Sequence, residues 1–310
     1  MNPRENFLAA ITFGQPEYVP LGSEPVYHSF QFDGNFRMAD WTDHWGIGWE
    51  VGLAGTVPFP RHNPLPSLEQ LDDYHFPNPD ELAFTDDMRQ ALRGVDRGAQ
   101  LVKGELTYLL FERAWAIMGM ENLLTAFVTH SDEMHRFLHG IATYARDVFD
   151  RYLEIGVDAI GFSEDLGSQR ALMISPAMFR RFILPEYRFI FEHTLRAGRI
   201  VHFHSCGCIQ AIAGDLADIG VTILNPVQAR ANNLSTIKAG TAGRMALHGG
   251  IDTALLLNGT VAQVQAEVGR VMALLKPGGG YICSPDQDLP GIPVRNMQAL
   301  WDTARQLGRY

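Results

Sequence analysis

From about residue 157 onward, short apolar runs alternate with longer segments in which apolar residues recur every three or four positions. This alternation predicts parallel strands, each followed by a helix that crosses back over the sheet. The predicted strands are Val157–Ser163, Arg199–His204, Val221–Asn225, Met245–Gly249 and Tyr281–Cys283. The predicted helices are Pro176–Ala197, Ile209–Ile219, Leu234–Thr241, Thr260–Lys276 and Pro293–Leu307. The carboxy-terminal half is therefore expected to be built from βα units.

The amino-terminal half contains three further elements of clear period. Ser131–Ile155 carries an apolar stripe at spacings of three and four, which predicts a long amphipathic helix packed on a sheet. Leu101–Leu106 and Val19–Ser23 are predicted as strands, bringing the number of candidate strands to seven. An eighth strand would be needed to close a barrel.

The stretch Phe30–Pro79 keeps neither a helical nor a strand period and is rich in Pro, Gly, Trp and His. Long irregular segments inside compact domains are usually functional or disordered, and Trp41, Trp45 and Trp49 argue against disorder. We expect an elaborated loop that either covers the mouth of an active site, with His44 among its aromatic residues, or serves only for packing. Residues 1–310 are expected to form one domain, of which about the first 100 include this extension and cover.

Composition narrows the function classes. Of 310 residues, 46% are hydrophobic and 19% are charged, which suits a folded core. The net charge of −10, with no cluster of Lys or Arg, argues against nucleic-acid or anionic-membrane surfaces. No apolar run approaches the roughly 20 residues that span a bilayer, and the first residues do not resemble a secretory leader, so a cytoplasmic protein is expected.

The three cysteines cannot form a disulfide framework, and two of them follow predicted strands together with a histidine. His204 and Cys206, at positions i and i+2, point the same way, and Cys283 ends another predicted strand. The carboxyl ends of parallel strands share one edge, so these side chains could hold Zn²⁺ with a fourth position open. Buried structural roles are the alternative. Cys208 could add a second thiolate or only pack.

Carboxylates also follow the predicted strands. Glu164 and Asp165 come directly after Val157–Ser163, where each could be a fourth zinc ligand, handle protons, or cap the next turn. Asp252 could orient a ligand or act as a helix N-cap. Glu105 and Asp286 lie at strand ends as well and are weaker candidates.

Several motifs resemble the uroporphyrinogen decarboxylase superfamily. They are the run His202-Phe203-His204-Ser205-Cys206-Gly207, the segments His248–Asp252 and Pro277–Ile282, the segment Ser163–Gly167, and Pro3-Arg4-Glu5 near the start. The resemblance implies a TIM (β/α)8 barrel. Within the superfamily, a His-x-Cys followed far downstream by one Cys is similar to the zinc motif of the corrinoid-linked methyltransferases, and the positions matched here are His204, Cys206 and Cys283.

The chain departs from the decarboxylase branch in the segment Leu21–Tyr27, which has no arginine. A porphyrinogen carries several carboxylates that such arginines would compensate, so tetrapyrrole decarboxylation is not expected. The resemblance instead implies a zinc-dependent methyltransferase. Such an enzyme moves a methyl group between a small ether, amine or thiol and the cobalt of a corrinoid (cobalamin) held by a separate partner protein. A zinc-free lyase for a small carboxylated substrate and a non-catalytic barrel subunit are the alternatives.

Overall fold

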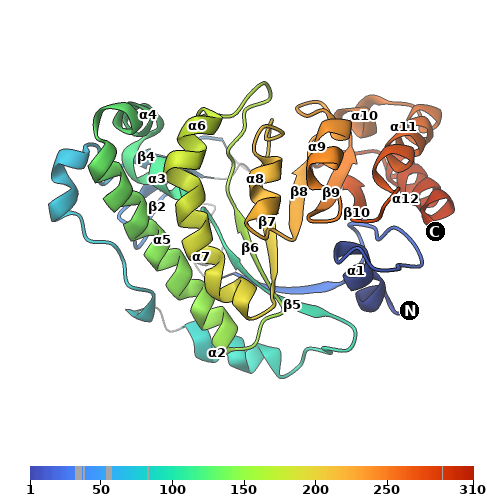
Figure 1. Cartoon of the computed structure of the whole chain (residues 1–310), viewed down its shortest axis with the longest axis horizontal. Coiled ribbons are helices and arrows are strands. Elements are labelled where there is room, and N and C mark those ends of the chain that lie inside the picture. The colour runs from blue at the N-terminus through green and yellow to red at the C-terminus, as the bar shows by residue number, and fades with distance from the viewer. Residues whose placement is uncertain (32–36, 38, 54–57, 82–83, 288) are drawn as a thin grey trace.

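The computed structural model describes residues 1–31, 37, 39–53, 58–81, 84–287 and 289–310. Its main feature is a seven-stranded parallel sheet in the order β1-β5-β6-β7-β8-β9-β10 (Figure 1). The strands are β1 (Tyr27–Gln31), β5 (Leu101–Leu106), β6 (Ala159–Ser163), β7 (Ile200–His204), β8 (Ile223–Val227), β9 (Ala246–Ile251) and β10 (Tyr281–Pro285). All seven strands follow one another in chain order, as successive βα units require.

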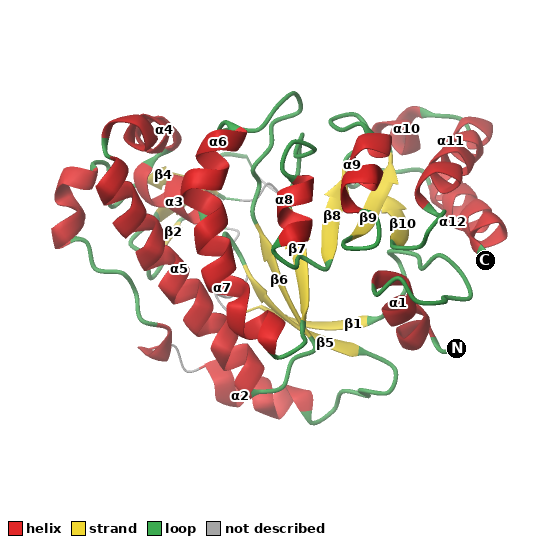
Figure 2. Ribbon diagram, viewed as in Figure 1, coloured by secondary structure: helices red, strands yellow, loops and turns green. Residues whose placement is uncertain are grey.

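Helices such as α5, α7 and α11 cover the outer face of this sheet (Figure 2). The helices of the chain are α1 (Pro3–Ile11), α2 (Phe84–Leu92), α3 (Phe111–Met118), α4 (Met120–Thr129), α5 (Ser131–Glu154), α6 (Pro176–Met178), α7 (Leu184–Arg196), α8 (Ala213–Asp218), α9 (Leu234–Thr241), α10 (Thr253–Asn258), α11 (Val261–Leu275) and α12 (Val294–Gly308). A single π-helical stretch, Phe179–Ile183, joins α6 to α7, and short 3₁₀ turns lie at Leu68–Asp73 and Pro79–Glu81. Within the described residues, no helix combines the length and the apolar composition needed to cross a membrane.

The predicted βα units from residue 157 onward are confirmed with boundary shifts of a few residues, and Leu101–Leu106 is confirmed without a shift. The predicted strand Val19–Ser23 is reduced to one parallel bridge, between Leu21 and Cys283. The sequence analysis missed β1, which pairs with β5. The reason is local: the Glu24 amide donates to the Leu21 carbonyl, so the chain turns after two residues and cannot continue the pairing.

The sheet is strongly curled. Tyr27 on β1 and His202 on β7 are three strand positions apart, about 14 Å in a flat sheet, yet their ring centroids lie 5.9 Å apart across the interior. At the amino-terminal edges of the strands, α1 closes this interior with an apolar cluster of Phe7, Ile11, Val26, Leu101, Ile223, Ala246 and Ile282. The interior is therefore apolar at its base and polar toward the carboxyl ends.

The amino-terminal extension forms structure of its own. Three short antiparallel strands, β2 (Trp41–Thr42), β3 (Gly48–Glu50) and β4 (Phe59–His62), make a separate sheet. Sequence analysis assigned this stretch to an irregular loop because strands of two to four residues are too short to show a period. The part of the expected extension that includes residues 32–36, 38 and 54–57 lies outside the described residues.

A buried carboxylate organises this small sheet. Asp43 accepts hydrogen bonds from the Trp45 and Ile47 amides and from Trp49 Nε1, each at 2.9 Å. Its Oδ2 also pairs with Arg113 of α3 at 3.3 Å, and both side chains are almost fully buried. Trp45 and Trp49 are only 3% and 2% exposed, so the packing interpretation is confirmed for these two residues.

Candidate metal centre

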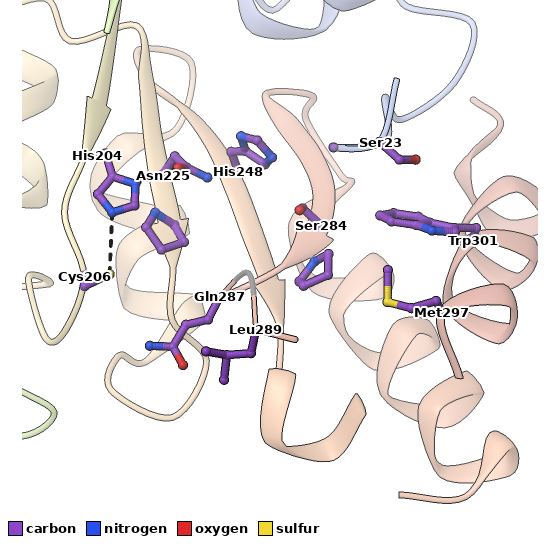
Figure 3. A pocket seen from close by; sticks show the side chains of 13 residues that line it. Ser23, His204, Cys206, Asn225, His248, Ser284, Gln287, Leu289, Met297 and Trp301 are labelled. Carbon is purple, nitrogen blue, oxygen red and sulfur yellow. Dashed lines mark hydrogen bonds between the residues drawn. The ribbon is translucent and has the colours of Figure 1, made fainter. Parts of the chain in front are cut away.

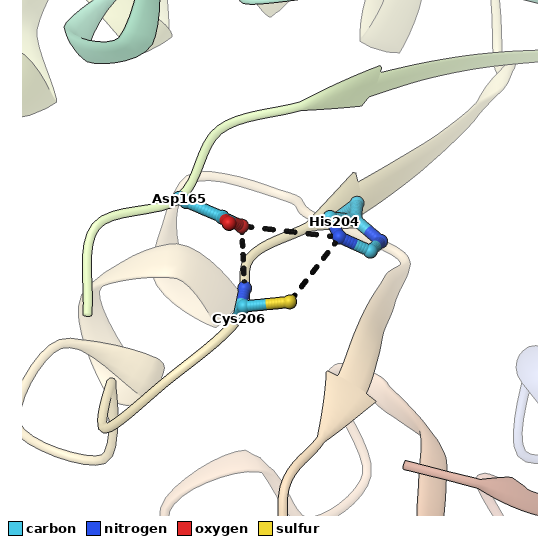
Figure 4. Close-up of side chains that lie close together, drawn as sticks. All are labelled: Asp165, His204 and Cys206. Atoms are coloured by element: carbon cyan, nitrogen blue, oxygen red, sulfur yellow. Dashed lines mark hydrogen bonds and ion pairs between the residues drawn. The ribbon is translucent and has the colours of Figure 1, made fainter. Parts of the chain in front are cut away.

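Three potential metal ligands meet at the carboxyl ends of β6 and β7: Asp165, His204 and Cys206 (Figure 4). The Cys206 Sγ lies 3.6 Å from His204 Nε2, and Asp165 Oδ1 lies 3.8 Å from the same nitrogen. All three ligand atoms lie within 4.8 Å of one another. His204 and Asp165 side chains keep 40% and 36% of their surface exposed, so the cluster can be reached from outside.

These separations fit a tetrahedral zinc ion. Zn–S bonds of about 2.3 Å and Zn–N bonds of about 2.0–2.1 Å at a tetrahedral angle place sulfur and nitrogen about 3.6 Å apart. The corresponding oxygen–nitrogen separation is about 3.4 Å, a few tenths of an ångström shorter than that between Asp165 and His204. A thiol, an imidazole and a carboxylate also form a ligand set that zinc accepts. The residues present therefore fit a three-ligand zinc site with one open position.

Asn225 on β8 orients the histidine. Its Oδ1 lies 3.1 Å from His204 Nδ1, and because an amide oxygen only accepts, Nδ1 carries the proton. The lone pair of Nε2 then faces Cys206 and Asp165, as a metal ligand requires. Asn225 ends the predicted strand Val221–Asn225, so its strand-end position was visible in the sequence although its role was not identified.

Two glycines allow the loops that carry the ligands to touch. A Cβ at Gly207, where φ is +83°, would lie 2.1 Å from the Gly167 carbonyl oxygen, and one at Gly167 would lie 2.6 Å from the Cys208 amide. Hydrogen bonds then join the loops: the Cys206 amide donates to Asp165 Oδ1 at 2.7 Å, and the Leu166 amide donates to Ser205 Oγ. The Gly positions in Ser163–Gly167 and His202–Gly207 thus set the distance between the ligands.

Burial and negative charge keep the Cys206 thiol protonated in the absence of a metal. Burial, followed by the carboxylates of Asp165 and Glu112, raises the pKa of Cys206 to about 12. Glu112 on α3 is itself buried, and burial together with Asp165 and Glu164 raises its pKa well above the usual range. Sequence analysis missed Glu112 because it lies in the first turn of a helix that the hydrophobic pattern did not predict. A divalent cation would offset this concentration of negative charge.

The structure does not bring Cys283 to this cluster. Ile282 packs in the interior and Ser284 lines the cavity near His204, so the side chain between them points to the opposite face of β10. Cys283 is 0% exposed within the outer hydrophobic core, and burial raises the pKa of its thiol to about 12. The grouped candidate ligands therefore include Asp165 and not Cys283, because the alternation along a strand decides which face a residue occupies.

Glu164 points away from the cluster and anchors α3. Its Oε1 accepts from the Phe111 amide and the Tyr187 hydroxyl, both at 2.6 Å, and its Oε2 accepts from the Leu110 and Glu112 amides at 3.0 and 3.2 Å. The side chain is fully buried. Burial raises the pKa of Glu164, and these hydrogen bonds oppose the rise. Of the two adjacent carboxylates, Asp165 faces the candidate metal centre and Glu164 caps a helix.

The other carboxylate candidates have structural partners. Asp252 is the N-cap of α10 and accepts from the Ala254 and Leu255 amides, which bears out the capping alternative. Asp286 is buried and accepts from the Ala229 and Thr253 amides, tying the loops after β8 and β9 to β10. Cys208 is buried beside the cluster but is not among the three grouped ligands.

A cavity of about 530 Å³, the outer cavity, opens beside the cluster (Figure 3). His204, Cys206 and Asn225 line one end, His248, Gln287 and Leu289 lie between the ends, and Met297 and Trp301 line the far end. A second cavity of about 290 Å³, the inner chamber, shares His204 and Asn225 and reaches down into the curled sheet to Lys103, Glu105 and His202. The candidate metal centre therefore lies at the junction of two cavities, and Glu105 lines the deeper one.

Comparisons with known proteins agree with this architecture. A methyltransferase from Methanosarcina mazei superposes with a TM-score of 0.76 at 15% identity, and the alignment covers 99% of both chains. A B12-independent methionine synthase from Shewanella aligns over 72% of this chain and 64% of its own at 10% identity, with a TM-score of only 0.47. No curated protein matches the sequence. The sequence model of uroporphyrinogen decarboxylase (URO-D) matches residues 43–307, and the chain therefore belongs to the URO-D family.

Proposed function

We propose that the protein is a zinc-dependent methyltransferase that moves a methyl group between a small substrate and the cobalt of a corrinoid carried by a separate protein. The observation that carries the proposal is the convergence of Asp165, His204 and Cys206 at the junction of two cavities. The fold shared with the Methanosarcina methyltransferase and the absence of arginine from Leu21–Tyr27 both support methyl transfer over porphyrinogen decarboxylation.

Each residue has a defined task in this mechanism. Asn225 holds the His204 ring so that Nε2 faces the ligand position, and the Cys206 amide holds the Asp165 carboxylate beside it. Cys206 gives up its thiol proton when a cation binds, because a thiolate is the ligand form. When bound, zinc would act as a Lewis acid that turns a substrate thiol into a thiolate or makes an ether oxygen a better leaving group.

The cavities define where the reacting molecules would lie. The inner chamber, at about 290 Å³, has room for a small molecule alone, while the outer cavity, at about 530 Å³, extends from His204 past Leu289 to the side chains of Met297 and Trp301. Methyl transfer requires the reacting atoms about 3–3.5 Å apart, so the corrin face would have to approach from the outer cavity, next to His204 and Cys206. The transfer can run in either direction with the same ligands, and we favour demethylation of the substrate.

Metal analysis tests the proposal first. The wild type should bind one zinc per chain, Cys206→Ser should lose it, and Cys208→Ser and Cys283→Ser should keep it as matched controls. The second step is to mix zinc-loaded protein with a corrinoid protein and methylated ethers, amines and thiols while the cobalt absorption spectrum is followed. Full methyl transfer by zinc-free protein, or loss of the substrate's methyl group in a mixture without any corrinoid, would contradict the proposal.

We further propose that the seven-stranded sheet is part of a closed barrel. The Cys283 amide donates to the Pro20 carbonyl, and the Gly22 amide donates to the Cys283 carbonyl, each at 2.9 Å. These bonds place Pro20–Gly22 beside β10 in the parallel sense, where the eighth strand of a TIM barrel would lie. Hydrogen exchange tests this proposal, since the Gly22 and Cys283 amides should exchange as slowly as those of β9.

A further inference from the structure

The inner chamber contains polar groups that the proposed metal centre does not use. Lys103 and Glu105 lie two residues apart on β5, both facing inward, and Lys103 Nζ is 2.6 Å from Glu105 Oε1. His202 lies beside them on β7 and is 8% exposed. Both of its ring nitrogens are buried and have no hydrogen-bond partner. A buried imidazole without partners costs free energy unless another molecule supplies them, so the chamber is built to receive a polar group.

The sequence makes room for this arrangement at Gly161 on β6. A Cβ there would lie 3.0 Å from Lys103 Cδ and 3.6 Å from Glu105 Cγ, so any larger residue would push the lysine stem aside. Glu105, Gly161 and His202 are register partners on β5, β6 and β7 and therefore form one layer of the interior. His204 belongs to the layer above, in register with Ser163. The charged pair thus lies directly below the candidate metal centre.

The charges select the kind of molecule that the chamber can hold. Among the described residues that line the two cavities, Lys103 and Glu105 are the charged pair, and together they are neutral. A ligand that carries only a negative charge would be repelled by Glu105. A ligand that carries only a positive charge would be repelled by Lys103. A ligand with one charge of each sign can pair with both and adds no net charge to a confined space.

We propose that the inner chamber binds the zwitterionic head, an ammonium group beside a carboxylate, of a small amino-acid-like molecule. The carboxylate contacts Lys103, the ammonium contacts Glu105, and the rest of the molecule extends up toward His204. The proposal deepens the proposed function by naming the class of substrate. It rests on the proposed function only in calling the bound molecule a substrate. Binding in the chamber can be measured without any methyl transfer.

Four probes that share a methylthio group but differ in charge separate the possibilities by titration calorimetry on the zinc-loaded protein without a corrinoid partner. S-methyl-L-cysteine carries both charges, 3-(methylthio)propionate lacks the ammonium, 2-(methylthio)ethylamine lacks the carboxylate, and 2-(methylthio)ethanol lacks both. The zwitterion should bind at least about tenfold more tightly than each of the other three, since each missing charge removes a charge-assisted hydrogen bond.

Variants of the chamber residues test whether a preference for the zwitterionic probe arises from binding in the inner chamber. Lys103→Met with Glu105→Gln removes both charges together, leaving no unpaired buried charge to unfold the protein, and should abolish the preference. Lys238→Met is the matched control, because that lysine lies on α9 outside the chamber and donates to the Gly279 carbonyl; it should retain the preference. Equal affinities for the four probes, no binding by any of them, or an undiminished preference in the double variant would overturn the proposal.

These outcomes are distinguishable from failure of the proposed function. Tight zwitterion binding without methyl transfer to any corrinoid protein would contradict the methyltransferase and leave the chamber assignment standing. Methyl transfer from donors that lack a zwitterionic head, with no binding of S-methyl-L-cysteine, would overturn the chamber assignment alone.

Discussion

Glu164 provides the sharpest test, because the sequence placed it at the active site and the structure places it under α3. In Glu164→Gln, an amide NH₂ must replace one carboxylate oxygen. At the Oε2 position it would face two backbone N–H groups, so it should take the Oε1 position, where the Tyr187 hydroxyl can turn round to accept. The Phe111 amide, now 2.6 Å from Oε1, would then be left without an acceptor.

The expected loss in the free energy of unfolding follows from these contacts. One buried donor without a partner costs about 1–3 kcal/mol. Removal of the negative charge from the N-terminus of α3 costs a further amount of about 1 kcal/mol at this buried site. We therefore expect Glu164→Gln to lower the free energy of unfolding by about 2–4 kcal/mol. Zinc content and turnover should stay near wild type in the folded fraction.

Urea denaturation followed by circular dichroism, combined with metal analysis of the native protein, measures both quantities. Glu121→Gln is the matched control, because Glu121 also lies in the first turn of a helix but is exposed, and its change should stay within about 1 kcal/mol. A loss of less than about 0.5 kcal/mol in Glu164→Gln, together with loss of zinc from folded protein, would refute the structural role. That result would indicate that Glu164 acts at the metal site, as the sequence analysis expected.

Three further outcomes are expected. Asn225→Ala should weaken zinc affinity by about 10- to 100-fold in chelator competition, because His204 loses the contact that orients it; unchanged affinity would contradict that role. Burial raises the pKa of Glu112 above its unfolded value, so this residue lowers stability as pH rises through the raised pKa. In chelated protein, the free energy of unfolding of Glu112→Gln should therefore rise relative to wild type as the pH rises above the usual carboxyl range, by at most about 1.4 kcal/mol per pH unit. A constant difference would argue against it. Asp43→Ala should cost about 3–5 kcal/mol in urea denaturation because Arg113 loses its buried partner, and a change within about 0.5 kcal/mol would count against that pairing.

Local patterns in the sequence determined the βα units and the loops that carry the ligands. Strands such as Leu101–Leu106 and helices such as Leu234–Thr241 were predictable because a buried strand and an amphipathic helix each impose a period. His204 and Cys206 were predictable as neighbours because residues i and i+2 at a strand end share a side.

Only the tertiary structure decided which side chains complete the site. Cys283 has the right chemistry and lies on a strand, but its side chain points to the face of the sheet that packs in the hydrophobic core. Side chains alternate between the two faces of a strand, and the sequence alone does not show which face Cys283 occupies. Asp165 and Glu164 are adjacent and chemically alike. They separate because α3, which the hydrophobic pattern did not reveal, brings three amides to Glu164, while Gly167 and Gly207 bring Cys206 to Asp165. Such contacts join residues about 40 to 54 positions apart, and a one-dimensional pattern carries no information about which distant donor will reach a given carboxylate.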